Sequence, residues 1–370
     1  MVKKAKNSRL PPRRLSIIVK PTSECNLSCE YCYTDHNSSQ ERMNDKTLEN
    51  MISKSLEIHD IVHFIWHGGE PLLMPIEFYE KALNLQRKYP GKKTTNGFQT
   101  NGTLVTEEIL DFCEEYSFDL GFSLDGPKRI NDRTRHFKNK NSSFKKTLKA
   151  IKKAQERDVG GGAIVVVNKL NINYLTEIYE FAQTENINLK LNPLIKSGKA
   201  TINYHDLGIG SAEYGKALTK LFDVWFQDDS SVSIDPFEEL MGNILTEEPW
   251  GCNYSISCQS SFISIGPEGD IYPCGRFEGI EDFNLGNINE NDLYEVLTSE
   301  KRGELRQRSS KIEECTSCDY KKICNSGCMH NAYMFTEDIH TKDHYCASYK
   351  LLFQHIAGKI EQELEKAEVK

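Results

Sequence analysis

The stretch CNLSCEYC, residues 25–32, places three cysteines close together near the start of a chain of 370 residues. Cys25, Cys29 and Cys32 have the spacing C-x3-C-x2-C, which lets three thiolates on one loop turn toward a common centre. A structural zinc site takes four ligands, whereas a [4Fe–4S] cluster takes one thiolate per iron. The spacing therefore predicts a cluster with one iron left open for a cofactor or substrate. Zinc with a distant fourth ligand, or a chance grouping, are the alternatives that the spacing leaves.

Composition places the chain among globular proteins, with 27% charged and 38% hydrophobic residues. Its length allows one large domain and a smaller one. The net charge of -8 argues against a general nucleic-acid binder, which needs clustered Lys and Arg. Residues 1–15 form a basic tail, and the apolar run SIIV that follows is too short for a signal peptide. No stretch is as long as a membrane span. We therefore expect a cytoplasmic protein that binds neither nucleic acid nor membrane.

The remaining cysteines form a second group. The chain has twelve in total, and a chain of this kind in a reducing compartment is not expected to hold a disulfide framework. Cys113 stands alone in a helical pattern and is interpreted as a small buried hydrophobe. The second group consists of Cys252, Cys258, Cys274, Cys315, Cys318, Cys324, Cys328 and Cys346. Eight thiols suit two four-ligand centres, and two zinc sites are the alternative to two clusters.

Short β-rich apolar runs alternate with longer helical patterns between residues 16 and 195. The runs are 16–22, 63–69, 94–102, 118–126, 163–167 and 188–195. This alternation indicates a parallel sheet with right-handed crossovers. Six units are too few for an eight-stranded barrel, so the prediction is an α/β fold with a partial (β/α)6 barrel.

Three further segments are expected after this barrel. They are a helical bridge over 196–250, a cysteine-rich domain over 251–350 and an amphipathic C-terminal helix over 351–370. Within the cysteine-rich domain, a hairpin is predicted to turn at Pro267, Glu268 and Gly269.

Polar residues follow the predicted strands, where a barrel of this kind gathers its reactive groups. They are HGGEP (67–71), QTNG (99–102), SLDGP (123–127) and Asn168. Gly68 and Gly69 permit a close backbone approach, and Glu70 offers a carboxylate suited to an amino group. Ser123 and Arg135 add polar groups at or near the same edge. The alternative for each residue alone is a helix cap or a turn.

Taken together, residues 14–195 resemble the radical S-adenosylmethionine (SAM) superfamily. The resemblance implies that a cluster on Cys25, Cys29 and Cys32 binds the amino and carboxylate groups of SAM through its open iron. The SAM contacts that it implies are Tyr31 near the adenine, Gly68, Gly69 and Glu70 near the amino group, Ser123 and Arg135 at the ribose and carboxylate, and Asn168. The implied chemistry is reductive cleavage of SAM to a 5′-deoxyadenosyl radical that abstracts a hydrogen. A flavodoxin- or ferredoxin-type protein is the expected electron donor.

The second cysteine group resembles the SPASM extension of radical SAM enzymes that modify peptides. The resemblance rests on YPCGRF (272–277), LGNI (285–288), CTSCDYKKICNSGC (315–328) and YC (345–346). It implies two auxiliary [4Fe–4S] clusters, and so three clusters in the chain. One auxiliary cluster would be held by Cys252, Cys258, Cys274 and Cys328, and the other by Cys315, Cys318, Cys324 and Cys346.

Nearly the whole chain resembles anaerobic sulfatase-maturating enzymes, which oxidise a Cys or Ser to formylglycine. In that family an Asp base follows the cysteine of the YPC motif. Gly275 stands there in this sequence, and a glycine has no side chain to reach a proton. His67 stands where Gln is expected, and WHGGEPLL resembles maturases that cross-link ribosomally made peptides.

The sequence therefore favours a peptide maturase that installs a C–C cyclophane or thioether cross-link at an unactivated carbon, acting on a precursor peptide. Sulfatase maturation is the alternative. A non-catalytic iron–sulfur or zinc scaffold is disfavoured, because a scaffold has no need for an open iron beside GGEP.

Candidate catalytic groups on the substrate side are His67, Arg276 and Asp125, with His330 as a further binding group. Each has a structural alternative. Asp125 could only shape its turn, and His67 could be a satisfied polar group inside the barrel. Arg276 and His330 could form hydrogen bonds around an auxiliary cluster. The first strand is expected by about residue 16, which leaves no room for a leader-binding domain. A separate leader-binding protein, or the surface of 196–250, is the expected alternative.

Overall fold

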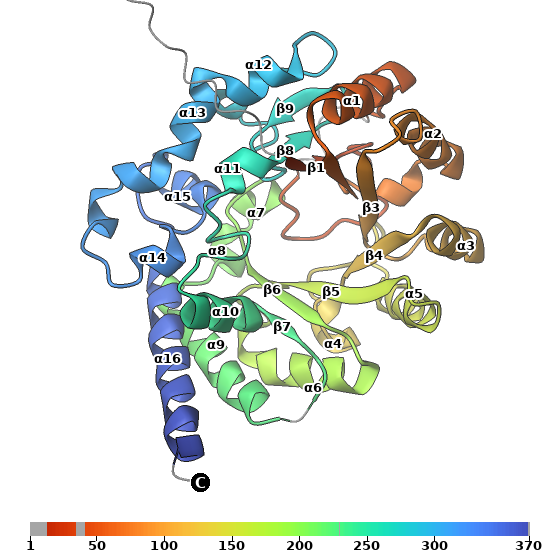
Figure 1. Ribbon diagram of the computed structural model, residues 1–370. Helices are drawn as coiled ribbons and strands as arrows, with labels where there is room; N and C mark the ends of the chain where they lie inside the picture. Colours follow the sequence, from red (N-terminus) through yellow and green to blue (C-terminus); the bar gives the residue numbers. More distant parts are fainter. Residues whose placement is uncertain (1–12, 35–40, 229, 369–370) are drawn as a thin grey trace, which may run out of the picture. The chain divides into compact units, whose positions relative to one another are not determined.

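The computed structural model describes residues 13–34, 41–228 and 230–368 (Figure 1). It divides into two compact units built from interleaved segments. The first unit comprises the described parts of 1–24, 39–97 and 257–307, and the second those of 25–38, 98–256 and 308–370. Each unit is therefore assembled from stretches far apart in sequence, and the second cysteine group is divided between them. The predicted basic tail lies almost wholly outside the described residues.

The first unit is organised around β1 (Arg14–Val19). This strand pairs in parallel with β2 (Ile61–Trp66) on one side and with β8 (Phe262–Ile265) on the other. β8 forms an antiparallel hairpin with β9 (Asp270–Tyr272), which also pairs with β10 (Gly286–Asn287). The hairpin was expected from the sequence, but its pairing with the first strand was not.

Helix α1 (Asp45–Ile58) makes the crossover between β1 and β2. Asn44 caps its first turn by accepting a hydrogen bond from the backbone of Thr47. The apolar face of α1 buries Leu48, Met51 and Ile52. The other elements of this unit are η1 (Pro71–Leu73), α2 (Ile76–Gln86), α11 (Cys258–Ser261), η3 (Glu281–Phe283), α12 (Leu293–Thr298) and α13 (Glu300–Arg306). The chain crosses from the first unit to the second within β3 (Lys93–Thr100).

The second unit holds four parallel strands. They are β4 (Phe118–Ser123), β5 (Gly160–Val167), β6 (Leu189–Pro193) and β7 (Ile234–Asp235), paired in that order. α3 (Glu107–Tyr116) leads from β3 into β4, α5 (Phe144–Glu156) lies between β4 and β5, and α6 (Leu175–Glu185) lies between β5 and β6. β5 begins at Gly160 with φ +121°, and a Cβ there would overlap the carbonyl oxygen of Leu120. Glycine at this position therefore allows the two strands to meet.

The last part of the second unit is helical. α16 (Cys346–Glu368) packs along α9 (Ser211–Phe226), and α10 (Phe237–Thr246) lies against α16 as well (Figure 1). A Cβ on Gly215 of α9 would lie 2.8 Å from Cα of Ser348, so only glycine permits this close crossing. The shorter elements are α4 (Lys128–Asn131), η2 (Ile172–Tyr174), α7 (Lys199–Ile202), α8 (Tyr204–Leu207), η4 (Arg308–Lys311), η5 (Glu313–Cys315), α14 (Lys321–Cys324) and α15 (Met329–Thr336).

The predicted class, an α/β fold with parallel strands and a cysteine-rich C-terminal part, is confirmed. Each of the six predicted runs overlaps one of the strands β1 to β6, and four of these strands begin one to three residues before the run. Cys113 is fully buried on α3, as expected. Within the described ranges, the structure contains no helix with the length and apolar character that crossing a membrane requires. The predicted domain boundaries stay predictions.

Candidate active site

The loop of the first three cysteines belongs to the second unit, and all three thiols are half-buried. Backbone hydrogen bonds hold this loop in place. Ser28 and Glu30 donate to the carbonyl oxygens of His136 and Thr134, both at 2.9 Å. The backbone N–H of Lys199 donates to the carbonyl oxygen of Cys32 at 2.9 Å. The loop is therefore fixed by residues that come much later in the chain.

Asn101 is a supporting residue that the sequence analysis did not single out. Its side-chain amide lies 3.9 Å from Sγ of Cys25 and donates to the side chain of Asn26 at 2.8 Å. An amide that faces a ligand sulfur orients the thiolate and influences the potential of a cluster. The signal for this residue was present, because Asn101 is the asparagine of the QTNG motif.

Tyr31, Asp125 and Arg135 form one buried network in the second unit. The Tyr31 hydroxyl donates to Oδ2 of Asp125 at 2.7 Å, and Nη1 of Arg135 donates to the same hydroxyl at 2.9 Å. Asp125 also accepts from the Thr134 hydroxyl and the backbone of Val166, both at 3.0 Å. Burial raises the pKa of Tyr31 well above its ordinary value and keeps its phenol protonated. The network ties the SLDGP turn to the cysteine loop.

The remaining predicted cofactor contacts of this unit stand at strand ends. The Ser123 hydroxyl closes β4 and accepts from the Gln99 side chain at 3.1 Å. Asn168 is fully buried and uses both ends of its amide within its own turn. It donates to the carbonyl of Val166 and accepts from the backbone of Leu170. The Asn168 side chain thus shapes the loop after β5, and its role as a SAM contact stays a prediction.

The HGGE segment follows β2 in the first unit and packs on the chain before the cysteines. The backbones of Gly69 and Glu70 donate to the carbonyls of Thr22 and Glu24 at 3.0 and 2.8 Å. A Cβ on Gly69 would overlap the carbonyl oxygen of Glu24. Glu70 is fully buried and accepts from the backbone N–H of Leu72 at 3.1 Å. The glycines are thus required by a backbone approach, as the sequence indicated.

His67 is held in one tautomer. The backbone N–H of Gly68 donates to its Nδ1 at 2.8 Å, which leaves the ring proton on Nε2. Burial, together with the positive charge of Lys20, lowers the pKa of His67 to about 4. The imidazole is therefore neutral near pH 7 and presents an N–H rather than a lone pair.

A buried lysine stands beside His67, and the sequence analysis did not find it. Lys20 is 2% exposed and donates to the carbonyl oxygen of Gly275 at 3.0 Å. It also forms an ion pair with Glu278. Arg276 lies half-buried in the same turn. Lys20 gave no motif signal, because it simply continues the first apolar run.

The first unit also contains Cys258 and Cys274, both half-buried. The Gln259 side chain donates toward Sγ of Cys258 at 3.4 Å, and Arg302 donates to Gln259 at 2.8 Å. Arg302 is fully buried, and burial lowers its pKa to about 10. A buried guanidinium close to these thiols would supply positive charge to an anionic cluster.

Cys252 and Cys328 belong to the second unit, where Cys252 is exposed and Cys328 half-buried. The backbone of Cys328 donates to Oδ2 of Asp343 at 2.6 Å. His330 is fully buried at the start of α15. The grouping of Cys252 and Cys328 with Cys258 and Cys274 rests on the resemblance and stays a prediction.

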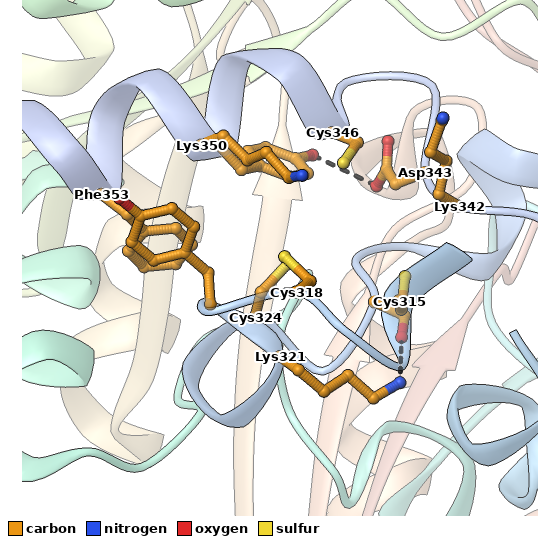
Figure 2. Close-up of a pocket in the computed structure, with 12 residues that line it drawn as sticks. Cys315, Cys318, Lys321, Cys324, Lys342, Asp343, Cys346, Lys350 and Phe353 are labelled. Atoms are coloured by element: carbon orange, nitrogen blue, oxygen red, sulfur yellow. Dashed lines mark hydrogen bonds between the residues drawn. The ribbon is translucent and has the colours of Figure 1, made fainter. Parts of the chain in front are cut away.

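Four cysteines of the second unit line one pocket (Figure 2). They are Cys315, Cys318, Cys324 and Cys346, the set expected for the second auxiliary cluster. Lys321, Lys342 and Lys350 line the same pocket. Burial raises the pKa of Cys324 to about 12, so its deprotonation requires a positive partner. Iron would supply this charge together with the lysines.

The four thiols around this pocket fit an iron–sulfur cluster. Within the described ranges, no three His, Cys, Asp or Glu side chains lie close enough to share a single metal ion. A [4Fe–4S] cluster is larger than one ion and takes one thiolate at each iron, so its ligands stand farther apart. Four thiols that line the pocket of Figure 2 match the four ligands that such a cluster takes.

Comparison with known proteins gives two matches to protein families. Residues 19–182 match the radical SAM superfamily, and residues 252–319 match SPASM, an iron–sulfur cluster-binding domain. A cysteine-type anaerobic sulfatase-maturating enzyme of Clostridium perfringens strain 13 is 32% identical over 366 residues, covering 94% of this chain and 96% of that protein. A serine-type enzyme of Bacteroides thetaiotaomicron is 31% identical, covering 93% and 89%.

A solved structure has the same fold. Native anSMEcpe with bound AdoMet, which is SAM, and a Cp18Cys peptide superposes with a TM-score of 0.84 at 30% identity. The match covers 95% of this chain and 99% of that one. The likeness therefore includes both the strand–helix part and the cysteine-rich part.

The fold and the cysteine sets define a radical SAM enzyme with a SPASM domain. The chain belongs to the radical SAM/SPASM family that contains the anaerobic sulfatase-maturating enzymes. Its cofactors are SAM and [4Fe–4S] clusters, with auxiliary clusters in the SPASM domain. Which cysteine serves which cluster stays a prediction.

Proposed function

We propose that this enzyme oxidises a Cys or Ser side chain of a peptide or protein to formylglycine. The observation that carries the proposal is the likeness over nearly the whole chain to cysteine-type and serine-type sulfatase-maturating enzymes. The sequence favoured cross-linking, with formylglycine formation as the alternative. The relatives favour the opposite order.

Bound SAM would supply a 5′-deoxyadenosyl radical, and the residues of this chain position the reaction. Cys25, Cys29 and Cys32 would hold the cluster that reduces SAM, on a loop fixed by the Tyr31–Asp125 hydrogen bond. The resemblance assigns 68–70 to the SAM amino group. Removing two electrons from the substrate carbon takes one hydrogen atom, one proton and one electron, and an auxiliary cluster would accept that electron.

The partners belong to the same proposal. A peptide substrate agrees with the Cp18Cys peptide bound to anSMEcpe. A flavodoxin- or ferredoxin-type donor would reduce the cluster, and the reducing cytoplasm would keep the ligand thiols free of disulfides. A separate leader-binding protein belongs only to the cross-linking alternative, because that alternative requires a precursor peptide with a leader.

Cross-linking of a ribosomal peptide remains the second candidate, and Gly275 favours it. The residue after Cys274 carries no side chain, so position 275 itself provides no base for removing a substrate proton. Formylglycine formation therefore requires that another group of the chain take this proton.

The test uses the full-length enzyme, reconstituted with iron and sulfide under anaerobic conditions. It is incubated with SAM, a reductant and a sulfatase-type peptide that carries Cys, Ser or, as control, Ala at the target position. The expected result is 5′-deoxyadenosine together with an aldehyde that forms a hydrazone on the Cys or Ser peptide. SAM cleavage without an aldehyde would contradict the proposal and leave the cross-linking candidate.

A further inference from the structure

Lys20 and Glu278 meet at the edge of the first unit where β1, β2 and β8 end. Lys20 follows β1 directly, and its backbone donates to the carbonyl oxygen of Ile265 at 2.9 Å. The Lys20 side chain is 2% exposed, whereas that of Glu278 is 22% exposed. A buried ammonium is costly unless a carboxylate and further acceptors pair with it. Glu278 and the carbonyl oxygen of Gly275 fill these roles.

The pair lies between the HGGE segment and the turn after Cys274. A Cβ on Gly68 would lie 3.1 Å from Cβ of Lys20, so this lysine packs directly on the segment. On the other side, Oε1 of Glu278 would lie 3.3 Å from a Cβ on Gly266. The Glu278 carboxylate therefore sits at the carboxyl ends of the strands, where parallel α/β folds place reactive groups.

Neighbouring groups are poorly suited to accept a proton. Nδ1 of His67 already accepts from the backbone of Gly68, and its Nε2 carries the ring proton. Arg276 offers only donors. Glu41 is a further carboxylate near Glu278, and burial together with the charges of Glu268, Asp270 and Glu278 raises the pKa of Glu41.

Other titratable groups lie around Glu278. Tyr272 on β9 lies within electrostatic reach of Glu278, and also of Asp270 and Glu281. Burial raises the pKa of Tyr272, so its phenol stays protonated near pH 7. Glu278 is therefore the carboxylate that is both ion-paired with Lys20 and open to solvent on one side.

We propose that Glu278 is the catalytic residue that removes the proton from the thiol or hydroxyl of the substrate. This role rests on the proposed formylglycine function. One hydrogen atom leaves Cβ of the substrate to the 5′-deoxyadenosyl radical, and Glu278 takes the proton from Sγ or Oγ. An auxiliary [4Fe–4S] cluster would accept the remaining electron as the C=S or C=O bond forms, and the Glu278 carboxylate becomes a carboxylic acid. Water then converts the thioaldehyde to the aldehyde and hydrogen sulfide.

The backbone explains how a carboxylate at 278 compensates for glycine at 275. Two successive turns join these positions, with the N–H of Phe277 donating to Cys274 and that of Ile280 donating to Phe277, both at 3.1 Å. Glu278 thereby returns to the ammonium that also binds the carbonyl of Gly275. A Cβ on Gly275 would lie 3.6 Å from Cε of Lys20, so an aspartate there would face the same ammonium.

The experiment compares Glu278→Gln with Glu41→Gln and with Glu281→Gln, whose side chain is exposed on η3. The reconstituted enzymes receive a peptide whose target cysteine carries deuterium at Cβ. Deuterated 5′-deoxyadenosine reports hydrogen abstraction, and the hydrazone reports complete oxidation. In Glu278→Gln, we expect deuterium transfer to continue while aldehyde per 5′-deoxyadenosine falls about 100-fold or more, the usual share of a general base. The two control variants are expected to keep the wild-type ratio.

Two further variants make the result decisive. Gly275→Asp in the Glu278→Gln background should restore most of the aldehyde, because it returns a carboxylate to Lys20. Glu278→Gln leaves the buried Lys20 ammonium without its carboxylate, which could impair folding. The double variant Lys20→Met, Glu278→Gln removes this ammonium, and its ratio of aldehyde to 5′-deoxyadenosine then tests the role of Glu278. A wild-type ratio in Glu278→Gln would show that Glu278 only neutralises Lys20 and would overturn the proposal. A wild-type enzyme that cleaves SAM without forming aldehyde would overturn the formylglycine function and the role of Glu278 together.

Discussion

Replacing Asp125 tests whether this carboxylate positions the cysteine loop or reacts with substrate. Its oxygens accept from the Tyr31 hydroxyl, the Thr134 hydroxyl and the backbone of Val166, and the side chain is fully buried. The Arg135 guanidinium reaches the same group through the Tyr31 hydroxyl. Asp125→Ala removes the acceptor of all three hydrogen bonds, together with one negative charge that acts on the Arg135 guanidinium. Asp125→Asn keeps the shape and one carbonyl oxygen.

The sizes of the two effects follow from these contacts. Asp125→Ala leaves three buried donors without their acceptor, at about 1–3 kcal/mol of folding free energy each, so we expect a loss of at least about 3 kcal/mol. In Asp125→Asn the amide NH2 faces a hydroxyl or a backbone N–H that had donated to the carboxylate. One buried hydrogen bond is then unsatisfied, which costs about 1–3 kcal/mol. The expected order of stability is wild type, then Asn, then Ala.

The assay is anaerobic denaturation of the reconstituted enzymes, read together with iron per chain and SAM cleavage. Asp111→Asn is the control, because Asp111 is a carboxylate of the same type with a side chain 67% exposed on α3. We expect stability and iron content to fall together in Asp125→Ala. An Asp125→Ala enzyme with wild-type stability and iron, but no product, would refute the positioning role and make Asp125 a direct participant.

Three further predictions concern other parts of the structure. Gly69→Ala should abolish SAM binding, measured by equilibrium dialysis, because its Cβ would overlap a backbone carbonyl; Gly242→Ala on α10, with open space around the new methyl, should bind SAM normally. Cys346→Ala should lower bound iron by about four atoms per chain in a colorimetric assay, because one cluster holds four irons. Burial and the neighbouring Lys20 lower the pKa of His67 from 6.5 to about 4. Between these two pH values, the unfolded chain therefore binds more protons at this residue than the folded chain does. Stability should therefore fall as the pH drops from 6.5 toward 4, and His67→Gln should lose that part of the slope in urea denaturation at pH 7 and pH 5.

Much of the fold could be predicted because its signals are local. The alternation of apolar residues marks β1 to β6, and the helical pattern of 45–60 marks α1. The pairing of β8 with β1 could not be predicted. These strands are separated by most of the chain, and four residues of β8 carry no register information about a distant partner. The interleaving of the two compact units has the same cause.

The candidate site divides in a similar way. The cluster ligands could be predicted from the cysteine spacing, because a cluster requires several thiols on few loops. The burial of Lys20 could not be predicted, since a lysine after an apolar run normally points to solvent. Its burial depends on Glu278 and on the carbonyl of Gly275, which the fold brings together from the far end of the sequence. Asn101 is intermediate, because its motif was visible but its contact with Cys25 was not.

Asp125 and Glu278 are the two carboxylates compared as the base, and their contacts distinguish them better than sequence motifs do. Asp125 lies in the conspicuous motif SLDGP, and Glu278 lies in no motif that the sequence analysis used. The oxygens of Asp125 accept three hydrogen bonds, and its side chain is fully buried, so few lone pairs are left for a substrate proton. Glu278 has one ion-pair partner and 22% of its side chain exposed. A base needs a free lone pair within reach of the proton that it removes. By this criterion Asp125 positions the loop, and Glu278 is the group placed to accept the proton.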